Sequence, residues 1–89
     1  MDLTHSTAVI TGGASGLGFS TAQFLISKGA NVALLDISEE QGHQSIAALN
    51  SNRAKFIKVD VREAEEVQNA LREVQTTFGP IHLCLNCAG

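Results

Sequence analysis

The chain has 89 residues, of which 44% are hydrophobic and 17% are charged, and its 6 basic and 9 acidic side chains give a formal net charge of −3. This composition predicts one compact domain, because a disordered segment would contain fewer apolar residues and more charge. The acidic balance disfavours nucleic acid as a partner, and no apolar run approaches the roughly 18 to 20 residues that span a bilayer. The first residues lack the basic segment of a signal peptide, so we expect a cytoplasmic protein without membrane contact.

The first part of the sequence predicts a strand, a helix and a second strand. Two short apolar runs, 7–11 and 31–36, have the length and β-branching of buried strands. A helical repeat lies between them, and Gly29 is placed to end that helix. The apolar face that the spacing predicts for it consists of Leu17, Thr21, Phe24, Leu25 and Lys28.

The remainder continues the alternation of helices and strands. A second helix opens at Ser38 with the S-x-x-Q spacing of a capping box, and residues 54–60 predict a third strand at a sheet edge. Glutamates open a third helix, which Gly79-Pro80 ends, and residues 81–86 predict a fourth strand. The apolar face predicted for the third helix consists of Val67, Ala70, Leu71, Val74 and Phe78.

This β-α-β-α-β-α-β succession predicts an α/β fold with a Rossmann-type, doubly wound parallel sheet. In the strand order 3-2-1-4 the first and fourth strands are neighbours whose connections leave on opposite faces of the sheet. Such sheets bind ligands at the carboxyl ends of these strands, a place that Gly12 and Cys87 border. We expect residues 1–89 to be the N-terminal portion of a single dinucleotide-binding domain that continues in a longer chain.

The glycine-rich segment after the first strand has the properties of a phosphate-binding turn. Gly12 permits a sharp turn, Gly16 leaves room for a pyrophosphate beside main-chain N–H groups, and Gly18 permits close helix packing. The hydroxyl of Ser15 and the N–H of Leu17 are further candidate donors. The alternative is a turn whose glycines serve geometry alone. The spacing matches neither G-x-G-x-x-G nor a P-loop, which argues against a triphosphate hydrolase.

Two acids end the second and third predicted strands. Asp36 stands where a carboxylate accepts hydrogen bonds from an adenosine ribose, although an acid at a strand end can also be a simple cap. The carboxylate of Asp60 can accept from an adenine amino group while the main chain of Val61 meets the ring. Asp60 can equally cap the third helix in a box with Glu63. The negative charge of Asp36 disfavours a 2′-phosphate and therefore favours NAD over NADP.

Together these motifs resemble the short-chain dehydrogenase/reductase family, because the glycine turn, Asp36, Asp60-Val61 and Asn86-Cys87-Ala88-Gly89 follow in the family's order. The resemblance implies hydride transfer between NAD and a secondary alcohol or ketone, a small-molecule substrate, and a homo-oligomer. It also implies a catalytic Ser, Tyr and Lys outside this segment. The cofactor-binding residues predicted by these arguments and by the resemblance are Gly12, Ser15, Gly16, Leu17, Gly18, Asp36, Asp60, Val61, Asn86, Cys87, Ala88 and Gly89.

Two positions depart from the usual family pattern. Cys87 stands where Asn is commoner, and Arg62 replaces the usual Ser or Thr at the start of the third helix. With the glycine turn, the first departure is most similar to the 3-hydroxyacyl-CoA dehydrogenase branch of the family. Two other functions fit a glycine turn and a strand-end acid. They are a dinucleotide-binding regulatory module without turnover and, less well, an S-adenosylmethionine-dependent methyltransferase.

The pair Cys84 and Cys87 also forms a C-x-x-C motif. In a strand, side chains three apart point to opposite faces, and their Cα atoms lie about 10 Å apart, beyond the roughly 7 Å that a disulfide bridges. The three histidines show no metal-ligand spacing. We therefore expect neither redox nor metal chemistry, with Cys84 buried and Cys87 contributing its backbone.

Overall fold

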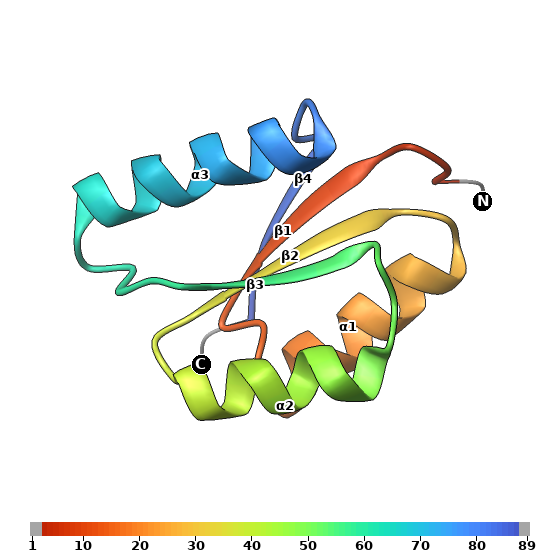
Figure 1. Cartoon of the computed structure of the whole chain (residues 1–89), viewed down its shortest axis with the longest axis horizontal. Helices are drawn as coiled ribbons and strands as arrows, with labels where there is room; N and C mark the ends of the chain where they lie inside the picture. Colours follow the sequence, from red (N-terminus) through yellow and green to blue (C-terminus); the bar gives the residue numbers. More distant parts are fainter. Residues whose placement is uncertain (1–2, 88–89) are drawn as a thin grey trace.

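The computed structural model describes residues 3–87 as a parallel sheet between two layers of helices (Figure 1). The strand order is β3-β2-β1-β4 and every pairing is parallel, which confirms the predicted doubly wound α/β sheet. The strands are β1 Thr7–Thr11, β2 Asn31–Asp36, β3 Ala54–Lys58 and β4 Leu83–Asn86, and the helices are α1 Gly16–Ser27, α2 Glu39–Leu49 and α3 Ala64–Phe78.

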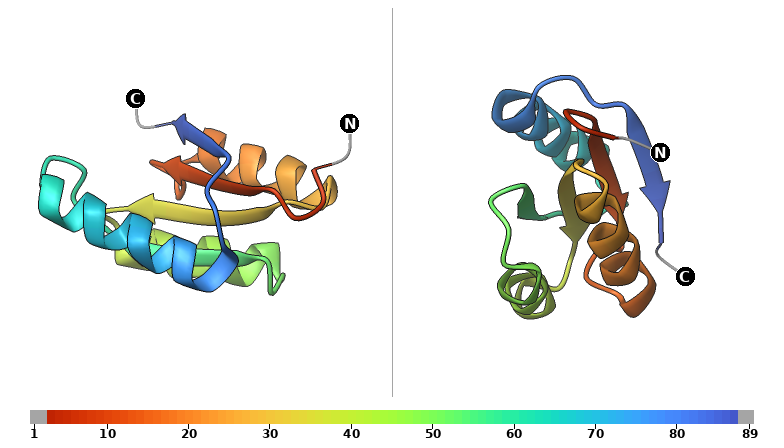
Figure 2. Two further views of the ribbon diagram at one scale, coloured as in Figure 1. Left: turned by 90° about the horizontal axis from the view of Figure 1, so that it is seen from above. Right: turned by 90° about the vertical axis from the view of Figure 1, so that its right-hand side faces the viewer.

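Apolar clusters fill both faces of the sheet, because successive residues of the two central strands point to opposite sides. Figure 2 shows α3 on one side of the sheet, α1 and α2 on the other, and β4 at the edge beside β1. The cluster under α1 and α2 contains Ala8, Ile10, Ala22, Leu25, Ala30, Val32 and Leu34. The cluster under α3 contains Val9, Ala33, Leu35, Val59, Ala70 and Val74.

The packing of α1 corrects the predicted apolar face of that helix. The helix buries Gly18, Ala22 and Leu25, whereas Leu17 and Phe24 are 67% and 55% exposed. At Gly18 a side chain has no room, because the start of α1 lies close against the glycine-rich turn. The helix ends at Ser27 with Lys28 as its C-cap, and Gly29 follows as the predicted terminating residue, with a φ of +95°.

The second helix is capped as predicted and packs closely on β3. Ser38 is its N-cap and accepts a hydrogen bond from the N–H of Gln41 at 3.3 Å. At Gly42 a Cβ atom would lie 2.2 Å from the ring of Phe56. The missing side chain therefore lets α2 approach β3.

The third helix uses the predicted face, with Ala70 and Val74 buried and Val67, Leu71 and Phe78 packed around them. An ion pair of 3.1 Å between Lys55 and Glu73 joins β3 to this helix. Strand β3 lies at a sheet edge, as predicted, but ends two residues early, and β4 begins two residues late. Within residues 3–87, none of the helices has the length and apolar character needed to span a membrane.

Candidate functional site

The candidate site lies at the carboxyl ends of β1, β2, β3 and β4. Thr11 pairs with Leu35 on one side and with Asn86 on the other. Because all four strands are parallel, the residues that follow them meet at one edge of the sheet. The glycine turn, Asp36, Asp60 and Cys87 all follow or end these strands there.

Hydrogen bonds within the glycine-rich turn define its shape. The N–H of Gly12, which has a φ of +68°, donates to Leu35 O at 2.8 Å. The hydroxyl of Ser15 donates to Gly12 O at 2.7 Å and accepts from the N–H of Gly18 at 3.1 Å. Ser15 is thus the N-cap of α1. A Cβ atom on Gly18 would lie 2.6 Å from Gly12 O, so this glycine is required for the helix to pack on the turn.

The start of α1 presents main-chain donors. Among residues 3–87 no acceptor is recorded for the N–H groups of Gly16 and Leu17, which lie in the first turn where helical partners are absent. No atom would lie within 4 Å of a Cβ atom on Gly16. Free N–H groups at the positive end of a helix dipole, beside open space, suit a phosphate group.

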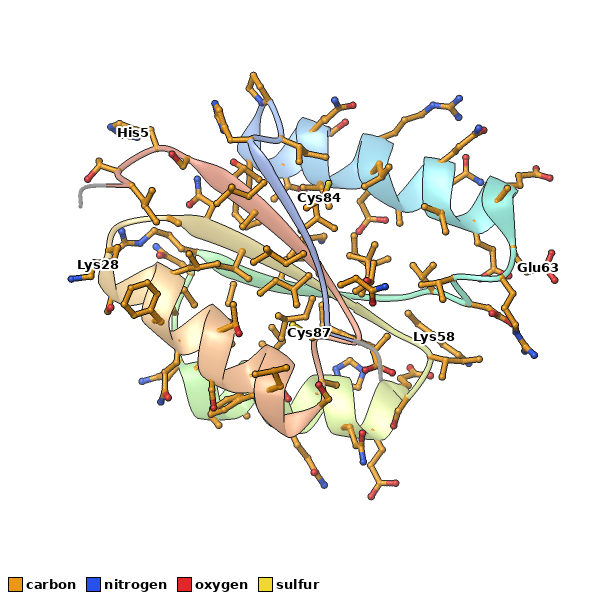
Figure 3. The ribbon with its side chains drawn as sticks, turned by 180° about the vertical axis from the view of Figure 1, so that it is seen from behind. His5, Lys28, Lys58, Glu63, Cys84 and Cys87 are labelled. Atoms are coloured by element: carbon orange, nitrogen blue, oxygen red, sulfur yellow. The ribbon has the colours of Figure 1, made fainter. Side chains whose placement is uncertain are left out.

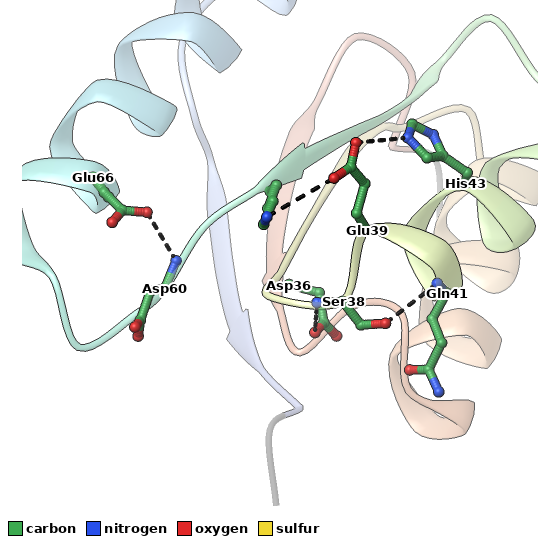
Figure 4. A network of polar contacts seen from close by, with 8 residues as sticks. Asp36, Ser38, Glu39, Gln41, His43, Asp60 and Glu66 are labelled. Atoms are coloured by element: carbon green, nitrogen blue, oxygen red, sulfur yellow. Dashed lines mark hydrogen bonds and ion pairs between the residues drawn. The ribbon is translucent and has the colours of Figure 1, made fainter.

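Asp36 joins the end of β2 to the glycine-rich turn. Its Oδ2 accepts from the N–H of Ala14 at 3.2 Å. Its Oδ1 accepts from the N–H of Ser38 at 3.1 Å (Figure 4). The carboxylate is therefore fixed while each oxygen keeps a further lone pair for a ligand hydroxyl. No feature of the sequence marks Ala14 for this contact, and it is the parallel pairing of β1 and β2 that brings its N–H to this acid.

A cavity of about 290 Å³ lies beside Asp36. Ile37 and Val61 are 55% and 50% exposed, and their side chains give the cavity apolar walls. Exposed apolar residues that flank a cavity suit a flat aromatic ring. The sequence pattern indicates only a main-chain role for Val61 and no role at the cavity for Ile37. The cavity is lined by Gly12, Leu35, Asp36, Ile37, Val59, Asp60, Val61 and Arg62.

The carboxylate of Asp60 binds Arg62 rather than capping α3. Oδ1 accepts from the main-chain N–H and from Nε of Arg62, both at 3.0 Å, and Oδ2 accepts from Nη2 at 2.9 Å. These hydrogen bonds lower the pKa of Asp60 to about 2. The N-cap of α3 is Glu63, without a side-chain hydrogen bond, so the predicted capping box between Asp60 and Glu63 is wrong. The main-chain N–H of Asp60 donates to Oε1 of Glu66 at 3.2 Å (Figure 4).

The end of β4 is tied to the end of β1. The hydroxyl of Thr11 lies 3.1 Å from Oδ1 of Asn86, to which it donates, and the N–H of Cys87 donates to Thr11 O at 2.8 Å. This places Asn86 and Cys87 beside the glycine-rich turn. The remaining two predicted residues, Ala88 and Gly89, lie outside the described residues.

The two cysteines lie on different sides of the sheet (Figure 3). Cys84 borders a groove beside α3, whereas Cys87 packs against the cluster under α1 and α2. Cys84 is exposed, which corrects the expectation that it is buried. The reason is that β4 is the outermost strand of the described sheet. Residues 3–87 contain no group of three or more His, Cys, Asp or Glu side chains that could hold a metal ion.

Comparison with known proteins agrees with this geometry. The sequence model of a family described as short chain dehydrogenase matches residues 6–89. The chain is 45% identical over 82 residues to the 3-hydroxyacyl-CoA dehydrogenase type-2 of Rattus norvegicus, covering 92% of this chain and 31% of that protein. It is 36% identical over 87 residues to the secoisolariciresinol dehydrogenase of Forsythia intermedia, covering 98% of this chain and 31% of that protein. The chain thus spans about a third of the length of these relatives.

Solved structures with the same fold are also known. A structure from Novosphingobium aromaticivorans assigned to the short-chain dehydrogenases has a TM-score of 0.88 and 30% identity, covering 93% of this chain and 31% of that chain. The 3-ketoacyl-(acyl-carrier-protein) reductase of Brucella melitensis, solved in complex with NADH, has a TM-score of 0.88 and 23% identity, covering 93% of this chain and 34% of that chain. The second likeness is one of fold.

Proposed function

The chain belongs to the short-chain dehydrogenase family, and we propose that it is the NAD-binding part of a longer oxidoreductase. The reaction is hydride transfer between NAD and a secondary alcohol or ketone. The bound nicotinamide supplies the hydride acceptor or donor. The residues of this chain bind and orient the adenosine and pyrophosphate half of the cofactor.

The observation that carries this proposal is the meeting of three chemically different features at one sheet edge. Free N–H groups at Gly16 and Leu17 suit a pyrophosphate. The fixed carboxylate of Asp36 suits the hydroxyls of a ribose. The cavity between Ile37 and Val61 suits an adenine ring. From the start of α1 to the cavity, the three features follow the order of pyrophosphate, ribose and adenine in an adenine dinucleotide.

NAD is favoured over NADP by the charge of Asp36. A 2′-phosphate would stand beside this carboxylate, and two like charges about 4 Å apart repel by about 4 kcal/mol at an effective dielectric constant near 20. Even if screening by solvent halved this repulsion, NAD would still bind more than tenfold more tightly than NADP. Lys58, the strand neighbour of Asp36, is paired with Glu39 at 3.9 Å, which reduces its attraction for a phosphate.

The substrate we propose is a 3-hydroxyacyl-CoA, supported by relatives of that name from Rattus norvegicus, Homo sapiens and Drosophila melanogaster that are 37% to 45% identical to this chain. The proton-transfer groups belong to the rest of the enzyme, because the chain contains no tyrosine. A homo-oligomer, a cytoplasmic location and the absence of nucleic-acid and membrane partners stay predictions. The exposed free thiol of Cys84 suits a reducing compartment.

The test is an activity assay with the complete protein and, separately, with residues 1–89. We expect the complete protein to reduce NAD in the presence of a 3-hydroxyacyl-CoA, and residues 1–89 alone to show no turnover. Turnover by the purified 89-residue chain would contradict the proposal that the catalytic groups lie outside these residues. NAD binding by the complete protein without turnover of any alcohol or ketone would instead support the regulatory module.

A further inference from the structure

Arg62 uses most of the hydrogen-bonding capacity of the Asp60 carboxylate. An ionised carboxylate offers about four acceptor positions, two on each oxygen. The main-chain N–H and Nε of Arg62 take both positions of Oδ1, and Nη2 takes one position of Oδ2. A single acceptor position is left, and it is on Oδ2.

The carboxylate is held in this orientation on a fixed piece of backbone. The N–H of Asp60 donates to Glu66 on α3, and its carbonyl accepts from the N–H of Glu63 at 2.9 Å. The Asp60 side chain is 20% exposed, whereas that of Arg62, which binds it, is 81% exposed. Both residues line the cavity whose apolar walls are Ile37 and Val61.

We propose that Arg62 is a positioning residue that makes this cavity selective for a purine with a 6-amino group, an inference that rests on the proposed binding of NAD. The guanidinium turns the carboxylate so that one acceptor on Oδ2 remains for the amino group of the base. A lysine cannot replace it, because an ammonium group is a point charge and cannot bind both oxygens with a planar fork.

The selectivity follows from donor and acceptor chemistry. Asp60 is ionised near pH 7 with or without Arg62, because even its ordinary pKa of 3.8 lies far below 7, and an ionised carboxylate only accepts hydrogen bonds. A 6-amino group donates to it, whereas the 6-oxo group of hypoxanthine places a second acceptor against it. Hydrogen bonds to charged groups contribute about 1.5 to 3 kcal/mol, so the two bases should differ in affinity by about tenfold to hundredfold.

The experiment compares the equilibrium binding of NAD and of nicotinamide hypoxanthine dinucleotide to the complete protein. Arg62→Ala and Arg62→Lys remove the planar fork, and Asp60→Asn removes the acceptor-only character of the acid. Arg72→Ala is the matched control, because Arg72 is an exposed arginine on α3 whose guanidinium bonds Asn69 and does not line the cavity. The readout is the ratio of the two dissociation constants, which a general loss of folding would not change.

We expect the unaltered protein and Arg72→Ala to prefer NAD by at least about tenfold. The preference should fall towards one in Asp60→Asn, and it should decrease in the two Arg62 variants, which keep the carboxylate but lose the fork that orients it. Equal binding of both dinucleotides by the unaltered protein would overturn the role of Arg62 and leave the proposed function standing. An unchanged ratio in Arg62→Ala, with weaker binding of both dinucleotides, would overturn the positioning role as well. If the unaltered protein bound neither dinucleotide, the proposed function itself would fail.

Discussion

Asp36 and Ala14 are joined by a hydrogen bond of 3.2 Å from the main-chain N–H of Ala14 to Oδ2 of the acid. The other carboxylate oxygen accepts from Ser38, just before α2. One side chain therefore links the glycine-rich turn, the end of β2 and the start of α2. A change at Asp36 alters the position of the turn as well as the charge beside the ribose.

Asp36→Asn should reduce the preference for NAD over NADP. Removing the negative charge removes the repulsion of a 2′-phosphate, and we expect the ratio of the two affinities to fall at least about tenfold. Titration of the complete protein with both cofactors measures it. Glu40→Gln, which removes one charge from an exposed residue of α2, is the control and should keep the ratio. Tighter binding of NADP than of NAD by the unaltered protein would contradict the assignment.

Alanine substitutions at two glycines of the turn should have different effects, one on folding stability and the other on cofactor binding. Gly18→Ala places a methyl group 2.6 Å from Gly12 O, and overpacking of this kind costs about 1 to 3 kcal/mol of folding stability. Gly16→Ala adds a methyl group in open space and should leave the melting temperature unchanged or raised. The same methyl group should weaken NAD binding at least about tenfold if the pyrophosphate passes there. If Gly16→Ala bound NAD as tightly as the unaltered protein, this would contradict the proposal that the pyrophosphate passes beside Gly16.

Thr7→Val should stabilise the protein. The Thr7 side chain is fully buried, and its hydroxyl has no hydrogen-bond partner among the described residues. Valine has nearly the same shape without this unpaired group, so we expect a gain of about 1 kcal/mol in the free energy of unfolding. Urea denaturation measures it. As the matched change, Thr11→Val should destabilise, because it removes the hydrogen bond to Asn86. A loss of stability in Thr7→Val would show that the hydroxyl has a partner.

The pKa of Asp60 should depend on Arg62. Its native value of about 2 lies below the ordinary 3.8, so the pair stabilises the folded protein fully above about pH 4, and this contribution is lost as the pH falls towards 2. In Arg62→Ala we expect the pKa of Asp60 to return towards 3.8. Carboxyl carbon shifts followed by NMR during an acid titration report it directly. An unchanged pKa in the variant would assign the shift to another group.

The two cysteines should remain separate thiols. Their positions on different sides of the sheet prevent a bridge between them. In residues 1–89 folded without reductant, alkylation followed by mass spectrometry should find two free thiols, with exposed Cys84 reacting before half-buried Cys87. An intramolecular disulfide or bound zinc in the folded protein would refute this.

The sequence was sufficient to predict the strand order, and with it that the glycine-rich turn, Asp36 and Asp60 lie at one edge of the sheet, because parallel pairing brings every strand's carboxyl end there. Asp36 and the glycine-rich turn were identified before their hydrogen bond was known. The bond itself involves a main-chain N–H at Ala14, and no side-chain pattern marks a main-chain donor. The side chain of Arg62 binds Asp60 across two positions of a loop, and no periodic pattern in the sequence marks such a pair.

The errors arose where burial depends on neighbouring elements. Helical spacing grouped Leu17 and Phe24 on one apolar face, but the sheet accepts the smaller side of α1, with Ala22 and Gly18. Cys84 was expected to be buried because it lies in an apolar run, yet its strand is at an edge. Periodicity identifies the type of an element better than it identifies which face has a neighbour.

The register of β1 with β2 has a consequence for engineering this protein. Thr11 pairs with Leu35, which places Asp36 one residue beyond the last paired position and beside the turn. A shift of one residue would turn the acid to the other face of the sheet and bring Leu35 or Ile37 to its place. Chimaeras made with other family members must therefore keep the number of residues between the start of β2 and Asp36. An insertion within β2 would move the acid away from Ala14 while leaving every residue of the motif in the gene.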